Sequence, residues 1–375
     1  FGIDAKEIAD IKAQMQAAID GGFIAGNILL VGNSEGVGVL ETAGTQGPEQ
    51  STPMDEQTLF RIYSMTKPIV SVATMTLVED GLLAISDPVS KYIPEFANMT
   101  VISEETGAIT PAANEMTVQD LLTHESGLIY GIFDPQSELG KMYFQAGSLR
   151  SDITALTLAQ NLAALPLRFE PGTKWNYSRS TDVLGAVIEV AAGKPLDALL
   201  NERIFAPLGM DETTFFVDVS KAARIAHPIH GEMADPTIVT PMLSGGGGLH
   251  STTEDYVRFA SMLLGGGEYN GTRILEADTL TAMQQKFIGD SVDRSAYFFG
   301  SRGDWGLGFH LQPIPGADNE GPFNFGWRGV GGTVFIVDPT NDFFMLYMAQ
   351  VQGGPAGAPM DLTKAQAAVY KAMLN

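Results

Sequence analysis

The sequence of 375 residues contains no cysteine. Disulfide bonds, zinc–thiolate sites, iron–sulfur clusters and cysteine nucleophiles are therefore excluded. Because a chain of this length can bury a large core without cross-links, the absence of cysteine does not identify the cellular compartment.

Positive charge is also scarce. The chain has 22 Lys and Arg against 44 Asp and Glu, which gives a formal net charge of −22 at pH 7. A non-specific nucleic-acid binder needs a basic face that displaces phosphate counterions. An anionic membrane surface likewise attracts basic segments. We therefore expect no nucleic-acid partner and no membrane partner.

Long apolar runs are the third absence. No stretch approaches the ~18 uninterrupted apolar residues of a membrane span. The sequence starts without methionine and shows no basic segment followed by an apolar one. We therefore expect that something upstream is missing, either a signal peptide or a trimmed start. We expect a soluble protein. Its compartment stays open, with a cytoplasmic location favoured over a periplasmic or secreted one. The sequence does not indicate the oligomeric state.

What is present is typical of a folded α/β protein. Hydrophobic residues make up 45 % and aromatics 9 % of the chain. Apolar periodicity predicts terminal helices, and strands at 27–31, 37–42, 59–63, 307–311, 333–337 and 344–348, with helices between. This order favours one α/β domain built from residues 1–75 and 240–375. Residues 76–239 would form a mostly helical domain.

The segment Ser64-Met65-Thr66-Lys67 carries the first chemical signal. A serine hydroxyl needs a base, and a lysine at i+3 lies on the same helix face. Pro68 is tolerated only in a first helical turn, so Ser64 should lie at a helix N-terminus that favours an oxyanion. As a base, Lys67 would need a lowered pKa. Alone, this spacing is more typical of an ordinary exposed helix start.

Two further segments add to this signal. Tyr177 follows a turn and precedes a predicted helix, where its hydroxyl could relay protons; an ordinary buried tyrosine is the alternative. Trp327-Arg328-Gly329 lies beside a predicted strand, where glycine lets the backbone approach a ligand; a bulge in an edge strand is the alternative.

Five ordered segments together resemble the serine β-lactamase and penicillin-binding-protein superfamily, in its class C and family VIII carboxylesterase branch. They lie at 61–68, 121–128, 171–178, 246–252 and 326–329, and the resemblance extends from about residue 20 to 350. It implies a class C β-lactamase-like fold, with an antiparallel sheet flanked by helices and a mostly helical domain. The active site would lie between the two domains.

The resemblance also assigns roles to residues. Ser64 would be the acylated nucleophile, Lys67 its base, and Tyr177 an assistant in proton transfer. The backbone N–H groups of Ser64 and Val330 would form the oxyanion hole. Water would then hydrolyse the acyl-enzyme, and this mechanism needs no cofactor and no metal.

The sequence departs from the β-lactamase pattern at two places. Trp327 stands where lactamases carry a lysine, and Arg179 where they carry an asparagine. Both changes favour esters, so we expect a carboxylesterase that cleaves short-chain esters of small molecules. The alternatives are a β-lactamase, an amidase or peptidase, an acyltransferase, or a non-catalytic binding homologue.

Four residues are candidates for substrate binding, namely Arg179, Trp327, Arg328 and Gly329. The two arginines could border the cleft, prefer a substrate with a distal carboxylate and help to lower the pKa of Lys67. Alternatively, each pairs with one of the many acidic residues and points away from the substrate.

Other patterns are weaker. Ser34 lies in a G-x-S-x-G sequence between two predicted strands, which indicates a hairpin tip rather than a nucleophile elbow. His227 and His230 lack a third ligand nearby, so no metal site is predicted. His124 is expected to be a buried hydrogen-bonding residue rather than a base.

Overall fold

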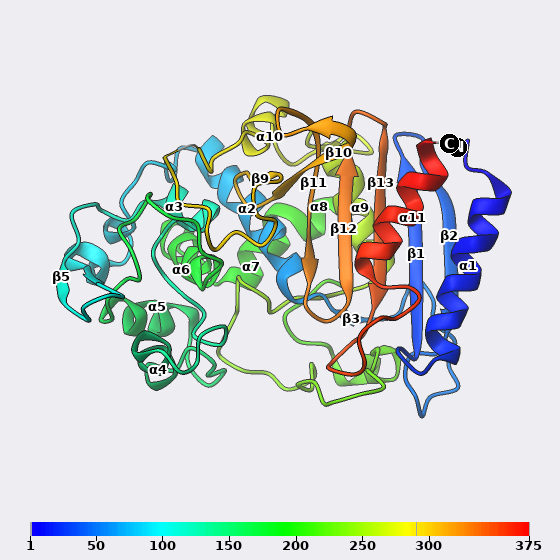
Figure 1. The fold of residues 1–375 in the computed structure, drawn as a ribbon, viewed down its shortest axis with the longest axis horizontal. Helices are drawn as coiled ribbons and strands as arrows, with labels where there is room; N and C mark the ends of the chain where they lie inside the picture. The colour runs from blue at the N-terminus through cyan, green and yellow to red at the C-terminus, as the bar shows by residue number, and fades with distance from the viewer. Residues whose placement is uncertain (1, 290, 375) are drawn as a thin grey trace.

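An antiparallel sheet of seven strands is the centre of the computed structural model, which describes residues 2–289 and 291–374 (Figure 1). The strand order is β2-β1-β13-β12-β11-β10-β9. The strands are β1 (Gly26–Asn33), β2 (Gly36–Gly44), β9 (Asp304–Trp305), β10 (His310–Asp318), β11 (Gly321–Gly329), β12 (Thr333–Asp338) and β13 (Phe343–Ala349). Because β1 pairs with β13, segments from both ends of the chain form one sheet, as predicted.

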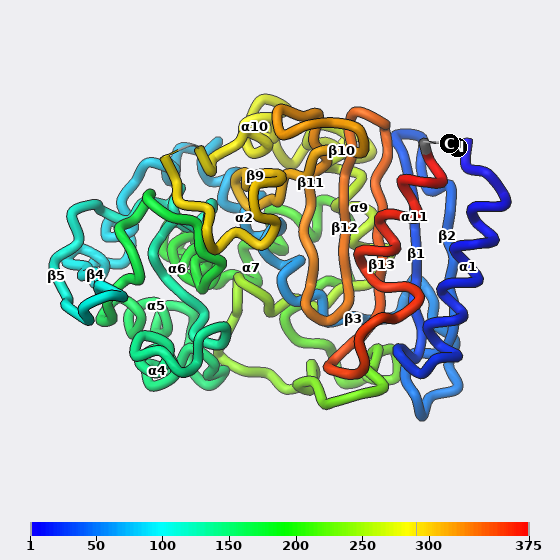
Figure 2. The backbone as a smooth tube through the Cα atoms, in the orientation of Figure 1, coloured from blue at the N-terminus to red at the C-terminus, as the bar shows by residue number. Residues whose placement is uncertain are grey.

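Helices cover both faces of this sheet. α1 (Ala5–Asp20) and α11 (Leu362–Leu374) lie side by side on one face (Figure 2). α9 (Thr253–Leu264) packs on the other face, against β12 and β13. α1 begins at Asp4, whose side chain accepts a hydrogen bond from the backbone N–H of Lys6. The predicted terminal helices are therefore both present.

α2 (Thr66–Glu79) links the sheet to the helical region. Every residue from Thr66 to Leu77 is buried, and the helix contacts α6 (Ser180–Ala192) and α7 (Leu196–Leu200). A single 3₁₀ turn, η1 (Tyr63–Met65), precedes it. A helix that is apolar on all sides is stable only when it is enclosed by other elements.

The helical region lies to one side of the sheet (Figure 1). Its other helices are α3 (Val118–Thr123), α4 (Glu138–Gln145), α5 (Ala155–Ala163) and α8 (Ala206–Leu208). Six short strands form three separate pairs: β3 (Phe60–Arg61) with β6 (His250–Ser251), β4 (Thr100–Ile102) with β5 (Ile109–Pro111), and β7 (Glu268–Tyr269) with β8 (Thr272–Arg273). The helix α10 (Ala277–Met283) follows β8. The predicted helices at 117–123, 154–165 and 181–192 are present, while the domain boundaries near residues 75 and 240 stay predictions.

Some strand predictions were wrong in extent. The strand expected at 59–63 is only Phe60–Arg61, because Tyr63 has φ 43°, which extended backbone cannot have. The strand expected at 307–311 begins at His310, after a bend at Gly308 with φ 91°. β11 was not predicted as a strand, since its glycines and proline interrupt the apolar alternation.

Candidate active site

Ser64 and Lys67 lie together at the start of α2. Ser64 is in the 3₁₀ turn η1, and Lys67 is in the first turn of the helix. The ammonium Nζ of Lys67 donates to Ser64 Oγ over 3.2 Å. Pro68 occupies the third helical position, where no intrahelical N–H bond is lost. The structure thus brings these two predicted site residues into hydrogen-bonding contact.

Tyr63 holds an unusual backbone conformation directly before Ser64. Its φ of 43° lies in the left-handed region, which costs a non-glycine residue about 1–3 kcal/mol and is concentrated at functional sites. A Cβ on Gly331 would lie only 2.7 Å from the Tyr63 ring. The tight turn between β11 and β12 therefore packs directly on the residue before Ser64.

The same turn carries Val330, the predicted second donor of the oxyanion hole. A Cβ on Gly329 would lie 2.3 Å from the carbonyl oxygen of Ile62, so glycine is required for this approach. Val330 follows at the tip of the turn, and its side chain is 79 % exposed. This geometry places the backbone of Val330 beside the segment that leads into Ser64, while its oxyanion role stays a prediction.

Lys67 is enclosed by three hydrogen-bond acceptors. Besides Ser64, its Nζ donates to the hydroxyl of Tyr130 over 2.8 Å and to the carbonyl oxygen of Gly246 over 2.6 Å. The side chain is buried, with the residue 1 % exposed. Three acceptors match the three protons of an ammonium group, so the site is built for a charged Lys67.

The pKa of Lys67 differs from the sequence-based expectation. Burial by itself lowers this pKa, but the charges and hydrogen bonds of Tyr130 and Tyr177 raise it more, so the net direction is upward. The lowered pKa that Lys67 would need as a resting base is therefore absent, and Lys67 rests as a cation. The reason is that two tyrosine hydroxyls converge on the ammonium, which the sequence spacing did not reveal.

Tyr130 is the site residue that the sequence analysis missed. Its ring lies 5.4 Å from that of Tyr177, and burial raises its own pKa to about 12 although Lys67 opposes this. It follows the predicted segment 121–128 by two residues, after the left-handed helix end at His124 returns the chain toward the site. A polar aromatic directly after that segment was the only available signal.

Tyr177 lies over Lys67 and is tied to Trp327. Lys67 Nζ is 4.6 Å from the Tyr177 ring centroid, and Trp327 Nε1 donates to the Tyr177 hydroxyl oxygen over 3.0 Å. Trp327 is buried within β11. The structure thus brings together all three predicted catalytic side chains, with the indole supplying a hydrogen bond to the tyrosine oxygen.

Arg179 belongs to a supporting network. Its guanidinium forms an ion pair of 3.0 Å with Asp182 and lies over the Tyr130 ring. Asp182 in turn accepts from the backbone N–H of Gly246, whose carbonyl accepts from Lys67. Although burial opposes charge on Asp182, Arg179 holds the pKa of that carboxyl below its ordinary value. This pairing favours a positioning role for Arg179 over the predicted substrate contact.

Arg328 faces away from the catalytic side chains. Neighbouring residues on a strand point to opposite faces, and Trp327 takes the face toward Tyr177. The Arg328 guanidinium lies 5.4 Å from the Phe299 ring centroid and feels the charge of Asp361, which precedes α11. Burial lowers its pKa. The substrate-binding role predicted for Arg328 therefore has no support from this orientation.

Of the residues set aside earlier, Ser34 lies in a distant hairpin, whereas the His124 ring packs 4.7 Å from the ring of Tyr177. Ser34 sits at the tip of the β1–β2 hairpin, where its hydroxyl donates to Asp342. His124 is buried, forms a 3.4 Å contact with Ser178 Oγ and has a pKa well below its ordinary value because of burial. A low pKa keeps this imidazole neutral, which fits the expected structural role.

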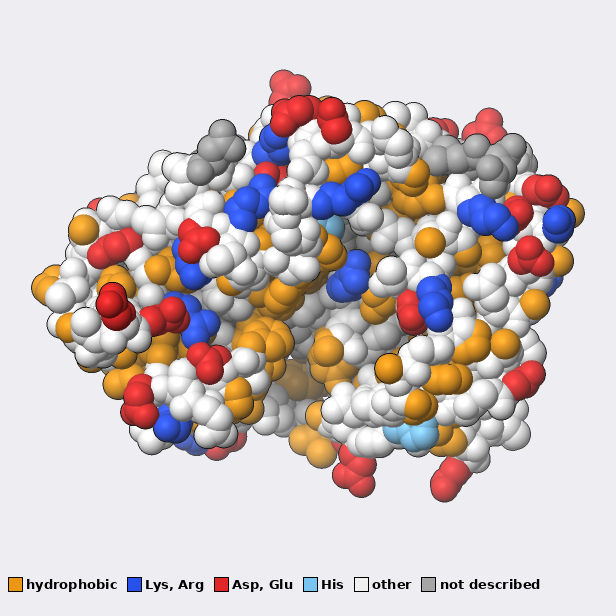
Figure 3. Space-filling view, viewed as in Figure 1, with side chains coloured by type: hydrophobic (Ala, Val, Ile, Leu, Met, Phe, Trp, Pro, Cys, Tyr) orange, Lys and Arg blue, Asp and Glu red, His pale blue; other side chains and the backbone are white. Residues whose placement is uncertain are grey.

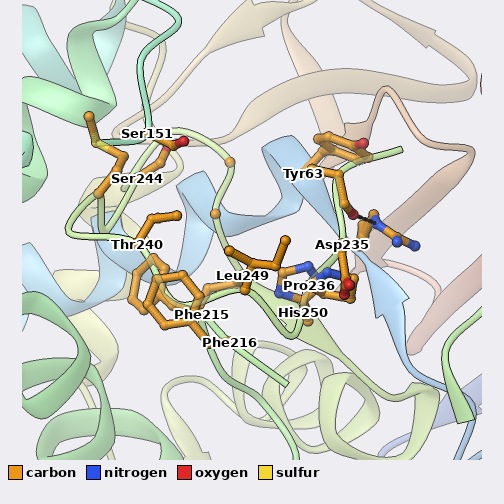
Figure 4. Close-up of a pocket in the computed structure, with 16 residues that line it drawn as sticks. Tyr63, Ser151, Phe215, Phe216, Asp235, Pro236, Thr240, Ser244, Leu249 and His250 are labelled. Atoms are coloured by element: carbon orange, nitrogen blue, oxygen red, sulfur yellow. Dashed lines mark hydrogen bonds between the residues drawn. The ribbon is translucent and has the colours of Figure 1, made fainter. Parts of the chain in front are cut away.

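A hollow opens at the middle of the molecular face in Figure 3, with hydrophobic side chains along its sides. A cavity of about 420 Å³ is lined by Tyr63, the residue before Ser64, and by Gly247 (Figure 4). Tyr63 lies on one side of it, and Phe215 and Phe216 lie on the other. Cavities of this size hold small organic ligands.

Comparison with known proteins finds related sequences along nearly the whole chain. The Beta-lactamase family model matches residues 11–370. Protein Rv1367c of Mycobacterium tuberculosis is 32 % identical over 363 residues, covering 90 % of this chain and 89 % of its own. Esterase EstB of Burkholderia gladioli is 31 % identical over 372 residues, with the same coverage of 90 % and 89 %.

A solved structure extends the similarity to three dimensions. The hydrolase EstCE1, described as having promiscuous acyltransferase activity, superposes with a TM-score of 0.79 at 25 % identity and covers 98 % of both chains. The fold is therefore of the class C β-lactamase type, as predicted. Among the described residues, no helix is both long enough and apolar enough to cross a membrane.

Proposed function

Because the chain belongs to the β-lactamase family of serine hydrolases, we propose that it is a carboxylesterase that forms an acyl-enzyme on Ser64. The observation that carries this proposal is the hydrogen bond from Trp327 Nε1 to the Tyr177 hydroxyl. The indole N–H carries no charge, and it is already bonded to Tyr177. The carboxylate of a lactam substrate would need a cation at this position. An ester needs no such charge.

The proposed reaction has two steps. Ser64 Oγ attacks the ester carbonyl carbon while its proton passes to the Lys67 and Tyr177 pair. The N–H groups of Ser64 and Val330 hold the oxyanion, and the alcohol leaves with a proton from Tyr177. Water then attacks the acyl carbonyl, and the acid is released from Ser64.

The proton route depends on the charge of Lys67. Since Lys67 rests as a cation, it cannot simply accept the Ser64 proton. The ammonium group lies 4.6 Å from the Tyr177 ring centroid, and Trp327 donates to the Tyr177 oxygen, so Tyr177 is the hydroxyl beside both groups. Tyr177 can therefore take the serine proton first and return it to the leaving alcohol.

Substrate comparison tests this proposal. Purified protein is assayed with p-nitrophenyl acetate, p-nitrophenyl butyrate and the cephalosporin nitrocefin, beside Ser64→Ala. We expect ester cleavage that falls at least about a thousandfold in the variant and little nitrocefin turnover. Fast nitrocefin turnover would instead indicate a β-lactamase. Ester cleavage that persists in Ser64→Ala would exclude the proposed nucleophile.

A further inference from the structure

The cavity beside the catalytic cluster is larger than a short acyl group requires. Its volume of about 420 Å³ falls in the range of pockets that enclose drug-sized ligands. Apolar side chains supply most of its walls. They are Phe215, Phe216, Pro236, Ile238, Met242 and Leu249.

This cavity lies next to the segment that carries Ser64, although Ser64 itself does not line it. Tyr63 lines it and is followed in the chain by Ser64. Gly247 lines it beside Tyr63 and follows Gly246, the acceptor of the Lys67 hydrogen bond. A substrate joined to Ser64 can therefore extend into the cavity without crossing Lys67 or Tyr177.

The position of Tyr177 decides which part of the substrate enters. The leaving alcohol must face the group that gives it a proton, and Tyr177 lies among the rings of Tyr130, Phe298 and Trp327. Within the described part of the chain, the lining of the cavity does not include Tyr177. An acyl group turned away from Tyr177 would extend along Tyr63 and Gly247 toward the cavity.

The polar groups of the cavity offer little to a charged acyl chain. The guanidinium of Arg61 already donates to the carbonyl oxygens of Ala226 and Ala234. Asp235 lies exposed in the lining and is an anion at neutral pH. A distal carboxylate on the acyl group would be repelled there, whereas an uncharged apolar chain would gain burial.

We propose that this cavity is the acyl-binding pocket, and that the preferred substrates are esters of bulky, uncharged, apolar carboxylic acids. The proposal rests on the esterase function and replaces the expectation of a short acyl chain. Hydrolysis stays the same reaction: the Ser64 acyl bond forms, the alcohol leaves with a proton, and water releases the acid.

A matched pair of variants in one loop tests the pocket. Both side chains are exposed, 59 % for Ile238 and 76 % for Val239, but only Ile238 lines the cavity. Ile238→Trp and Val239→Trp are assayed with p-nitrophenyl acetate, octanoate and hydrogen succinate. In the wild type we expect kcat/KM for octanoate to exceed that for acetate by about tenfold or more, and succinate to be poor.

The two tryptophan variants should differ in their preference for octanoate over acetate. Ile238→Trp should lower the octanoate-to-acetate ratio by about tenfold, and Val239→Trp should leave it unchanged. Gly247→Leu is a second test, because a Cβ there has ordinary contact space, 3.6 Å from Tyr63, and the added chain would fill the cavity mouth. We expect the same loss of octanoate preference.

Two outcomes would overturn the proposal while leaving the esterase function intact. One is Ser64-dependent hydrolysis that prefers acetate over octanoate. The other is an octanoate preference that neither Ile238→Trp nor Gly247→Leu reduces. By contrast, hydrolysis that survives Ser64→Ala would refute the esterase mechanism itself, so the two failures are distinguishable.

Discussion

The positive charge of Lys67 is stabilised by residues that lie far away in the sequence. The hydroxyls of Tyr130 and Tyr177 and the carbonyl oxygen of Gly246 surround its Nζ. Serine and tyrosine hydroxyls can each donate or accept, so a proton can shift within this cluster without loss of a hydrogen bond. The chemistry thus depends on a shared network rather than on one lowered pKa.

Tyr130→Phe should slow ester hydrolysis by about 10- to 100-fold without unfolding the protein, because Lys67 loses its 2.8 Å acceptor. The pH–rate profile should shift as well, since Tyr130 contributes to the raised pKa of Lys67. Steady-state kinetics from pH 6 to 10 measures both. Tyr269→Phe, in the distant strand β7, is the control. An unchanged rate and profile would remove Tyr130 from the mechanism.

Glu125 is expected to make stability depend on pH. Burial and the nearby charge of Asp120 raise its pKa to about 8, and its buried Oε1 lacks a hydrogen-bond partner among the described residues. A raised carboxyl pKa stabilises the fold fully below the unfolded pKa and loses that contribution as pH rises to about 8. The wild type should therefore lose up to ~4 kcal/mol between pH 5 and 8 from this group.

Urea unfolding of Glu125→Gln against the wild type at pH 5 and 8 measures this effect. The variant should show a smaller loss of stability over that range. Glu105→Gln, at an exposed position, is the matched control and should behave as the wild type. Equal pH dependence in Glu125→Gln and the wild type would show that the fold does not raise the pKa of Glu125.

Among elements, the β11–β12 hairpin and the start of α2 form one unit. Their approach requires glycine at 329 and 331, because any Cβ would meet the backbone of Ile62 or the ring of Tyr63. The sequence predicted Ser64 at a helix start and Trp327-Arg328-Gly329 beside a strand. It could not predict how closely the two elements approach, since only tertiary packing determines that distance.

Gly329→Ala should reduce kcat by about 100-fold or more, because its Cβ would push the hairpin and the Val330 N–H away from Ser64. Overpacking should cost about 1–3 kcal/mol of stability, so the variant stays folded at 25 °C. Kinetics and circular dichroism are measured together. Gly289→Ala, where a Cβ meets nothing within 4 Å, is the control. Full activity in Gly329→Ala would argue against an oxyanion hole at this hairpin.

The sheet and central helix could largely be predicted because their signals are local. Apolar alternation and turn residues indicated β1 and β2, and helical periodicity indicated α1 and α6. The pairing of Arg179 with Asp182 and the contact of Tyr130 with Lys67 were not predictable in the same way. Side-chain partners across the cluster depend on the packed fold, which periodicity does not encode.

At the scale of the whole molecule, the net charge of −22 should destabilise the folded state at neutral pH, because like charges repel one another. Raising sodium chloride from 0.02 to 0.5 M screens this repulsion and should raise Tm at pH 7.5 by roughly 1–3 °C. Near the sequence pI of 4.5 the same salt step should have little effect. A salt effect of equal size at both pH values would show that net charge is not its cause.

The central claim is that Ser64 carries the acyl group. The most direct measurement is intact-mass spectrometry after brief reaction with a serine-directed phosphonate ester, followed by peptide mapping. The account predicts one adduct per chain, located on Ser64, and none in Ser64→Ala. An adduct on Ser34 or elsewhere, or no adduct on a folded protein, would contradict it.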